Sequence, residues 1–266
     1  MKALLVTVFV FATVVVLALY AGQRKLMFPA PIAPLPADLG QDVEFVSLDA
    51  GYGLLALPRM RQASMPLLIF AHGNAEVAHW SIDSFDYFRA RGIAVLLLEY
   101  PGYAGAGGKP SATSMVASAV SAMDYAVARD DIDGDSVVIY GRSIGGGVAA
   151  QLAANRQSVA LVLESSFTSL AEVVTQLGFP AFLLRDQFDT ATVVADLEIP
   201  VLLYHGIEDQ IIGIQHSEKL AALAQNATLL KADCGHNDCP RPWQAMMQFM
   251  RSAGIRDVDT DVAALR

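Results

Sequence analysis

A run of β-branched residues that stops at a glycine-flanked serine limits the fold of this chain more than any other feature. Residues 137–140 read as a buried strand, residues 141–145 have the pattern Gly-x-Ser-x-Gly, and the small residues of 148–154 predict a helix. This strand, turn and helix would raise the serine, Ser143, above the end of a sheet and place the positive end of a helix beneath it. The two glycines suit so tight a turn because they carry no Cβ. The alternative is a glycine-rich loop that only joins a strand to a helix.

Further apolar runs alternate with helical patterns along the chain, which predicts a mostly parallel sheet covered on both faces. We expect an α/β fold with a central sheet of about eight strands and a small or minimal cap. The expected strands are 43–48, 53–57, 67–71, 93–98, 137–141, 160–163, 201–204 and 228–230, and the expected helices are 77–91, 111–128, 144–154, 216–224 and 242–252. Ser111 is the expected helix cap, and Trp80, Phe85 and Phe88 are expected to face the core.

The N-terminal residues are apolar enough to cross a bilayer. Residues 3–21 carry no charge and are rich in Val, Leu, Phe and Ala, and their length suits a transmembrane helix. A secretory signal peptide is the alternative, but its apolar region is usually shorter, and Ala21 marks a poor cleavage site. We expect an uncleaved single-pass anchor over 1–22. Positive charges flank it on both sides, so the orientation stays open, with an extracytoplasmic catalytic domain favoured.

The composition of the remaining chain predicts a linker, one domain and a tail, and its charge argues against nucleic-acid binding. Four prolines in 23–42 predict an extended linker, 43–253 has the size of one α/β domain, and 254–266 is a polar tail. The net charge is −9 and no cluster of basic residues occurs, which argues against nucleic acid as a partner. The two cysteines, Cys234 and Cys239, can form one local disulfide or remain free thiols.

A serine hydroxyl needs a histidine to accept its proton and an acid to orient that histidine. In this strand–turn–helix context the chain order is serine, acid, histidine. We select His236, in the loop after the last strand, as the base, and Asp209, after strand 201–204, as the acid. Glu208 and then Glu164 are the alternative acids. We expect the other late histidine, His216, to lie on the solvated surface.

Two backbone N–H groups should stabilise the oxyanion that develops during acyl transfer. One belongs to Ile144, which follows the serine, and the other to Asn74, in the loop after strand 67–71. His72 is expected to support this loop. The set of His72, His205, His236 and the cysteines lacks a recognised zinc spacing, so we expect neither a metal nor another cofactor.

Six motifs, taken together and in this order, resemble the α/β-hydrolase superfamily. They occupy 70–74, 99–103, 140–146, 164–169, 205–209 and 235–238. Within the superfamily, the chain is similar to membrane-anchored α/β-hydrolase-domain serine hydrolases and their serine-aminopeptidase-like relatives. The resemblance implies an α/β-hydrolase fold with Ser143 as nucleophile, Asp209 as acid and His236 as base, and Asn74 and Ile144 as oxyanion donors. The chain departs from the family at 99–104, where Asp-Tyr-Arg-Gly-Tyr-Gly is usual, and at 212–213, where Val-Pro is usual.

These observations favour a serine hydrolase that cleaves carboxylic esters or thioesters through an acyl-enzyme. Tyr103, Phe167 and Phe179 are the candidate substrate-binding residues, although the aromatic residues after 164 can also pack a crossing helix onto the sheet. The substrate would be a small acyl ester or thioester, with a lipid-linked one among the candidates. The alternatives are an aminopeptidase or amidase that acts on small peptides, and a binding protein with a hydrolase fold but no catalysis.

Overall fold

Eight strands form one sheet in the order β1-β2-β4-β3-β5-β6-β7-β8. The structure is a computed structural model, and it describes residues 1–257. β1 pairs antiparallel with β2, and β2 with β4, whereas all the other neighbours are parallel, as predicted. The strands are β1 (Val43–Ser47), β2 (Tyr52–Ala56), β3 (Met65–Ala71), β4 (Ala94–Glu99), β5 (Ile132–Arg142), β6 (Ala160–Glu164), β7 (Val201–Gly206) and β8 (Ala227–Ala232).

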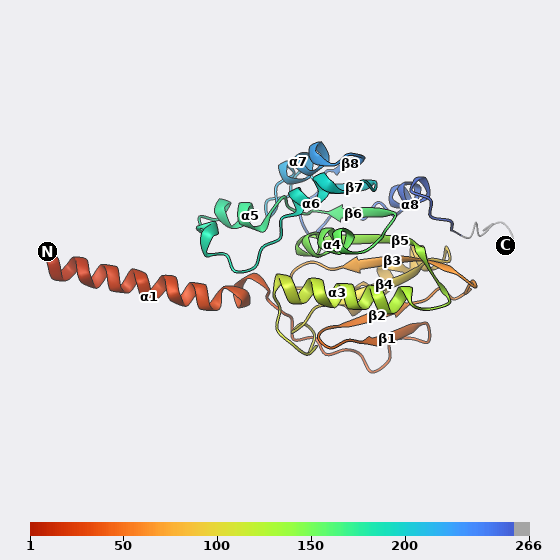
Figure 1. The fold of residues 1–266 in the computed structure, drawn as a ribbon, viewed down its shortest axis with the longest axis horizontal. Helices are drawn as coiled ribbons and strands as arrows, with labels where there is room; N and C mark the ends of the chain where they lie inside the picture. The colour runs from red at the N-terminus through yellow and green to blue at the C-terminus, as the bar shows by residue number, and fades with distance from the viewer. Residues whose placement is uncertain (258–266) are drawn as a thin grey trace.

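Helices cover both faces of the sheet (Figure 1). Alternate residues of a strand point to opposite faces, so β3 sends Leu67 and Ile69 into one core and Leu68 and Phe70 into the other. The first core packs against α3, α4, α6 and α7, and the second against η1, η2, α2 and α8. The helical elements are α1 (Lys2–Met27), η1 (Ala78–Ser81), η2 (Asp83–Phe85), α2 (Asp86–Arg89), α3 (Ala112–Val127), α4 (Ile144–Asn155), α5 (Leu170–Gln176), η3 (Ala181–Leu183), α6 (Thr190–Asp196), α7 (Gln215–Leu223) and α8 (Trp243–Ser252).

The expected helix over 77–91 is wrong, because short turns η1, η2 and α2 replace it. The backbone N–H groups of Trp80 and Phe85 donate to the carbonyls three residues earlier, each at 3.2 Å, which is the 3₁₀ pattern. Tighter 3₁₀ turns then change which side chains share a face. Phe85 and Phe88 are buried as predicted, whereas Trp80 is 56% exposed and does not face the core.

The N-terminal helix α1 projects away from the sheet (Figure 1). It is long and apolar enough to cross a membrane, and no residue of it is buried in the protein. The helix continues to Met27, past the predicted end of the anchor at 22. Phe28, which follows, is buried in the first core, so the chain is attached to the domain immediately after the helix.

The connection between β6 and β7 contains only α5, η3 and α6, which agrees with the predicted small cap. Ser111 caps α3 as predicted, because its hydroxyl accepts a hydrogen bond from the N–H of Ser114 at 3.0 Å. Part of the predicted polar tail, residues 258–266, lies outside the described residues.

Candidate active site

Ser143 lies at the turn from β5 into α4 in a strained backbone conformation, with φ 53° and ψ −120°. Only glycine fits two positions before it and two positions after it. A Cβ at Gly141 would lie 2.6 Å from the Cβ of Ala149, and a Cβ at Gly145 would lie 2.5 Å from the carbonyl oxygen of His72. The close packing of this turn therefore presents the serine hydroxyl at the carboxyl end of the sheet.

Two loops from the same edge of the sheet bring His236 and Asp209 to Ser143. The imidazole Nε2 of His236 lies 3.1 Å from the Oγ of Ser143, and its Nδ1 lies 2.6 Å from the Oδ2 of Asp209. Asp209 follows β7 and His236 follows β8, so the sheet order alone makes these loops neighbours. The three side chains form a continuous hydrogen-bonded chain with the geometry that nucleophilic catalysis requires.

The electrostatic environment keeps Asp209 ionised. Burial by itself would raise the pKa of this carboxyl, but hydrogen bonds from His205, His236 and the backbone of Ile212 outweigh it and hold the pKa well below its usual value. The N–H groups of Ile211 and Ile212 both donate to its Oδ1, at 2.9 and 2.8 Å. The ionised carboxylate fixes the orientation of the neighbouring imidazole through its Nδ1.

The other candidate acids and bases are engaged elsewhere or point to solvent. Glu208 is exposed. Glu164 is buried at the end of β6, where it accepts hydrogen bonds from Tyr140 and Arg241. The predicted surface position of His216 is wrong: its side chain is fully buried, and its Nδ1 lies 2.9 Å from the hydroxyl of Thr168. α7 packs against the cap through this histidine, and burial lowers its pKa.

The loop after β3 lies beside the serine. Its His72 is buried, with Nε2 3.1 Å from Glu99, and so supports the loop as expected. The side chain of Asn74 donates to the carbonyl of Met27 at 2.6 Å and accepts from the Tyr103 hydroxyl at 2.7 Å. These two contacts hold the backbone of Asn74 in place. Ile144 is the first residue of α4, where backbone N–H groups have no partner within the helix.

The three predicted substrate-binding residues occupy different environments. Tyr103 is buried and reaches the site only through its hydroxyl on Asn74. Phe167 is packed within the first core and presents almost no surface. Phe179 is half exposed on the cap, beside α1. The structure therefore brings Tyr103 to the loop after β3, places Phe167 in the core and places Phe179 near the N-terminal helix.

Known proteins share both this sequence pattern and this architecture. Residues 62–185 match the family described as serine aminopeptidase, S33. An uncharacterised protein of Mycobacterium tuberculosis is 31% identical over 239 residues, which cover 85% of each chain. The α/β hydrolase domain-containing protein WAV2 of Arabidopsis thaliana is 28% identical over 237 residues, which cover 77% of each chain.

Among solved structures, an acetyl xylan esterase from Paenibacillus sp. R4 superposes with a TM-score of 0.62 at 16% identity. The match covers 79% of this chain and 87% of that one. The chain belongs to the α/β-hydrolase superfamily. The sheet order and the serine turn of this hydrolase agree with that membership.

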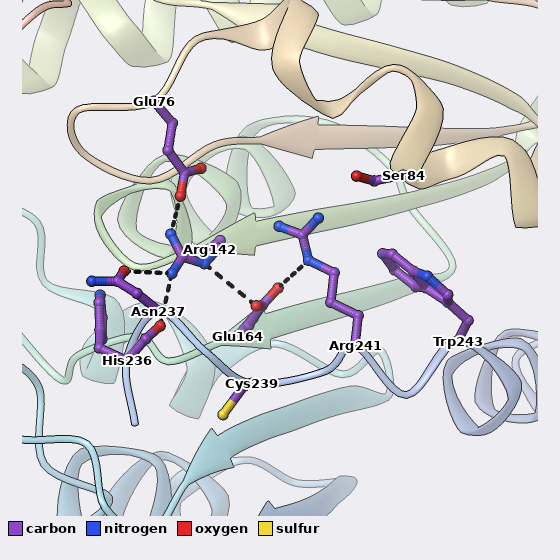
Figure 2. A pocket seen from close by; sticks show the side chains of 9 residues that line it. All are labelled: Glu76, Ser84, Arg142, Glu164, His236, Asn237, Cys239, Arg241 and Trp243. Atoms are coloured by element: carbon purple, nitrogen blue, oxygen red, sulfur yellow. Dashed lines mark hydrogen bonds and ion pairs between the residues drawn. The ribbon is translucent and has the colours of Figure 1, made fainter. Parts of the chain in front are cut away.

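Sequence reasoning missed one residue that holds the hydrolase site together, Arg142. Its guanidinium is almost fully buried, and it donates to the carbonyl of His236 at 2.7 Å and to the side chain of Asn237 at 2.9 Å. It also pairs with Glu76 and, at 3.4 Å, with Glu164. Figure 2 shows these contacts converging on the Arg142 guanidinium, which thereby ties the loop that carries His236 to Glu76 and Glu164. The variable position of Gly-x-Ser-x-Gly carries no signal of this role.

A pocket of about 470 Å³ opens beside this network in the hydrolase, next to Arg241 and Trp243 (Figure 2). A disulfide between Cys234 and Cys239 closes the loop around His236, which answers the question that the sequence left open. Within residues 1–257, no group of three or more His, Cys, Asp or Glu side chains is arranged to hold a metal ion.

Proposed function

We propose that this hydrolase cleaves carboxylic esters or thioesters through an acyl-enzyme intermediate. The observation that carries the proposal is the chain of contacts from Ser143 through His236 to Asp209, with separations of 3.1 and 2.6 Å. In the proposed mechanism His236 takes the proton of Ser143 as the hydroxyl oxygen attacks the acyl carbon, and then gives it to the leaving alcohol or thiol. Water, activated by the same imidazole, then releases the acid.

The negative oxygen of the tetrahedral intermediate would be held by the N–H groups of Ile144 and Asn74. Two features support this role for the loops. Ile144 begins α4, so the partial positive charge of the helix end adds to the hydrogen bond. Asn74 is held by Met27 and Tyr103, so its backbone is positioned before the substrate arrives. Donors that are already oriented need no reorganisation during the reaction.

An ester or thioester is favoured over a peptide with a free amino group. Such a peptide would need an unpaired carboxylate near the serine. Two nearby acids, Glu76 and Glu164, are paired with Arg142 and Arg241, and Asp209 is bound to His236. An aminopeptidase, which the name of the matching family suggests, therefore remains the second choice.

We also propose that α1 anchors the enzyme in a membrane as a single-pass helix, with the catalytic domain on the extracytoplasmic side. The length and apolar composition of α1 support the anchor. The disulfide between Cys234 and Cys239 supports the orientation, because such bridges persist in oxidising compartments. Alkaline carbonate extraction should leave the full chain in the membrane fraction, and release into the supernatant would contradict the anchor.

The test of the reaction is the variant Ser143→Ala, assayed with p-nitrophenyl butyrate. Turnover should fall by about 10³-fold or more, because the attacking oxygen is removed. Ser121→Ala, on the exposed face of α3, is the matched control and should keep wild-type turnover and the same melting temperature. Undiminished hydrolysis by Ser143→Ala would refute the assignment. Failure of the wild type to react with a fluorophosphonate probe would favour a binding protein instead.

A further inference from the structure

An apolar groove of about 420 Å³ runs between α1 and the cap. This volume lies within the range of about 300–1,000 Å³ that is usual for small-molecule sites. Its walls are mostly aliphatic and include Val16, Leu19 and Leu26 of α1 and Val174, Leu177 and Leu183 of the cap. Figure 1 shows α5 and the segment after it lying beside α1, away from the sheet.

Polar contacts fasten the two walls of the groove to each other. The side chain of Gln23 donates to the carbonyl of Leu183 at 3.0 Å and accepts from the N–H of Arg185 at 2.8 Å. Arg24 pairs with the buried carboxylate of Asp186 at 2.6 Å. Burial of that carboxylate makes the pair costly to break, so the groove is a fixed part of the fold.

The groove begins at a level that the bilayer would cover if α1 spans it. The uncharged run of α1 ends near Ala21, and a helix rises 1.5 Å per residue, so Val16 lies roughly 8 Å deeper in the apolar layer. The cap side chains that line the deeper end of the groove, beside Val16, then lie within the apolar layer as well. Leu177 and Phe182 on this cap segment are 73% and 86% exposed, which is unfavourable in water but suited to hydrocarbon.

The charges at the other end of the groove match a lipid headgroup layer. Lys25 and Arg185 are exposed there, whereas the chain as a whole has a net charge of −9. The guanidinium of Arg185 lies 5.4 Å from the ring of Tyr20, and tyrosine and basic residues are typical of the membrane interface. The apolar surface lies at the depth of the acyl chains, and the basic residues lie at the depth of the headgroups. An anionic bilayer surface attracts proteins with this arrangement.

The inner end of the groove meets the proposed oxyanion loop. Met27 lines the groove, and its carbonyl accepts the side-chain hydrogen bond of Asn74 at 2.6 Å. Asn74 follows Gly73 on the loop whose backbone packs against the serine turn. Met27 is therefore the residue that joins the groove to Asn74, whose N–H would bind the carbonyl oxygen of an ester.

We propose that this groove binds the acyl chain of a membrane-resident ester or thioester, and that residues 177–184 form a second membrane contact beside α1. The acyl chain is the chosen occupant because the groove is apolar, opens at bilayer depth and is lined by Met27, which binds Asn74. The choice of substrate rests on the proposed hydrolase function, whereas the membrane contact can be tested without any turnover.

The first test compares the hydrolysis of 4-methylumbelliferyl palmitate with that of 4-methylumbelliferyl butyrate, using the full chain in phosphatidylcholine vesicles. Val174→Trp should fill the groove and lower the palmitate-to-butyrate ratio of kcat/KM by at least about 10-fold, because each methylene that loses apolar contact weakens binding several-fold. The matched control Leu223→Trp, on the exposed face of α7, should leave the ratio unchanged. An unchanged ratio in Val174→Trp, with butyrate turnover that depends on Ser143, would overturn the groove and leave the proposed function intact.

The second test measures membrane contact by tryptophan fluorescence. The signal is the emission of the variant Phe182→Trp in excess of the emission of the wild type. Lipids brominated in the acyl chain should quench this added emission, whereas the emission added by Leu223→Trp should not change. Absence of quenching would overturn the second membrane contact, even if the protein hydrolyses neither ester. Loss of a dimer in Phe182→Asp, with unchanged vesicle binding, would show that a second copy covers the groove and would also overturn the proposal.

Discussion

Breaking the disulfide between Cys234 and Cys239 should destabilise the fold while leaving the active site assembled. The bridge closes a loop with a sequence separation of only 5. For so short a loop, the chain-entropy model gives a stabilisation of about 2 kcal/mol at 25 °C, because the bridge restricts the unfolded chain. For a domain of this size that corresponds to a fall in melting temperature of about 4–8 °C.

The catalytic loop has other supports that survive reduction. Arg142 still donates to the carbonyl of His236 and to Asn237, and the N–H of Gly235 still donates to Asp238 at 2.6 Å. Turnover of p-nitrophenyl butyrate at 25 °C should therefore stay within about 10-fold of the untreated value, since hydrogen bonds to a charged group are worth about 1.5–3 kcal/mol each.

The assay is thermal unfolding and esterase turnover of the wild type with and without dithiothreitol. The control is the double variant Cys234→Ser and Cys239→Ser, which should have the lower melting temperature and show no further response to the reductant. The chain holds only these two cysteines, so thiol titration in denaturant should find none before reduction and both afterwards. Two free thiols in the untreated protein would refute the bridge, and a collapse of turnover at 25 °C would show that the bridge, rather than Arg142, positions His236.

Three substitutions test the remaining contacts. Arg142→Lys keeps the charge but loses the planar fork on His236 and Asn237, so kcat should fall by about 10–100-fold with little change in KM in steady-state assays. Asp209→Asn should lower kcat by about 10⁴-fold, as for the corresponding change in the serine-protease triad, because the imidazole takes the wrong tautomer. His216→Gln should weaken the pH dependence of the free energy of unfolding, as measured by urea denaturation. Burial lowers the pKa of His216, so only the unfolded wild type gains this proton as the pH falls below about 6.5, and stability is lost there.

Each of these substitutions has an outcome that contradicts its reasoning. Wild-type kcat in Arg142→Lys would mean that a single donor suffices to hold the histidine loop. Wild-type turnover in Asp209→Asn would exclude that residue as the orienting acid. A steep fall in stability of His216→Gln between pH 6.5 and 5, equal to that of the wild type, would assign the effect to another group.

The local pattern of the chain was enough to predict most of the architecture. Strand 67–71 is apolar throughout because it is covered on both faces, and this shows directly in its composition. The turn around Ser143 was also predictable, because a Cβ at Gly141 would collide with Gly145 and Ala149 of the same strand, turn and helix. The need for glycine at 145 is instead tertiary, since a Cβ there would meet the carbonyl oxygens of Ala71 and His72 at the end of β3. The prediction of a helix over 77–91 failed because the backbone there closes 3₁₀ hydrogen bonds, such as Trp80 N–H to the carbonyl of Val77, and apolar spacing does not distinguish these short turns from one α-helix.

The tertiary structure alone decided which distant groups meet. The sequence by itself determined the strand–turn–helix unit and the order of serine, acid and histidine along the chain. It held no sign that Arg142 would bind the carbonyl of His236, that His216 would be buried, or that α1 would form a groove with residues 174–184. Periodicity reports only whether a residue faces the core, whereas the partner of a side chain depends on the order of the strands and the path of the loops between them.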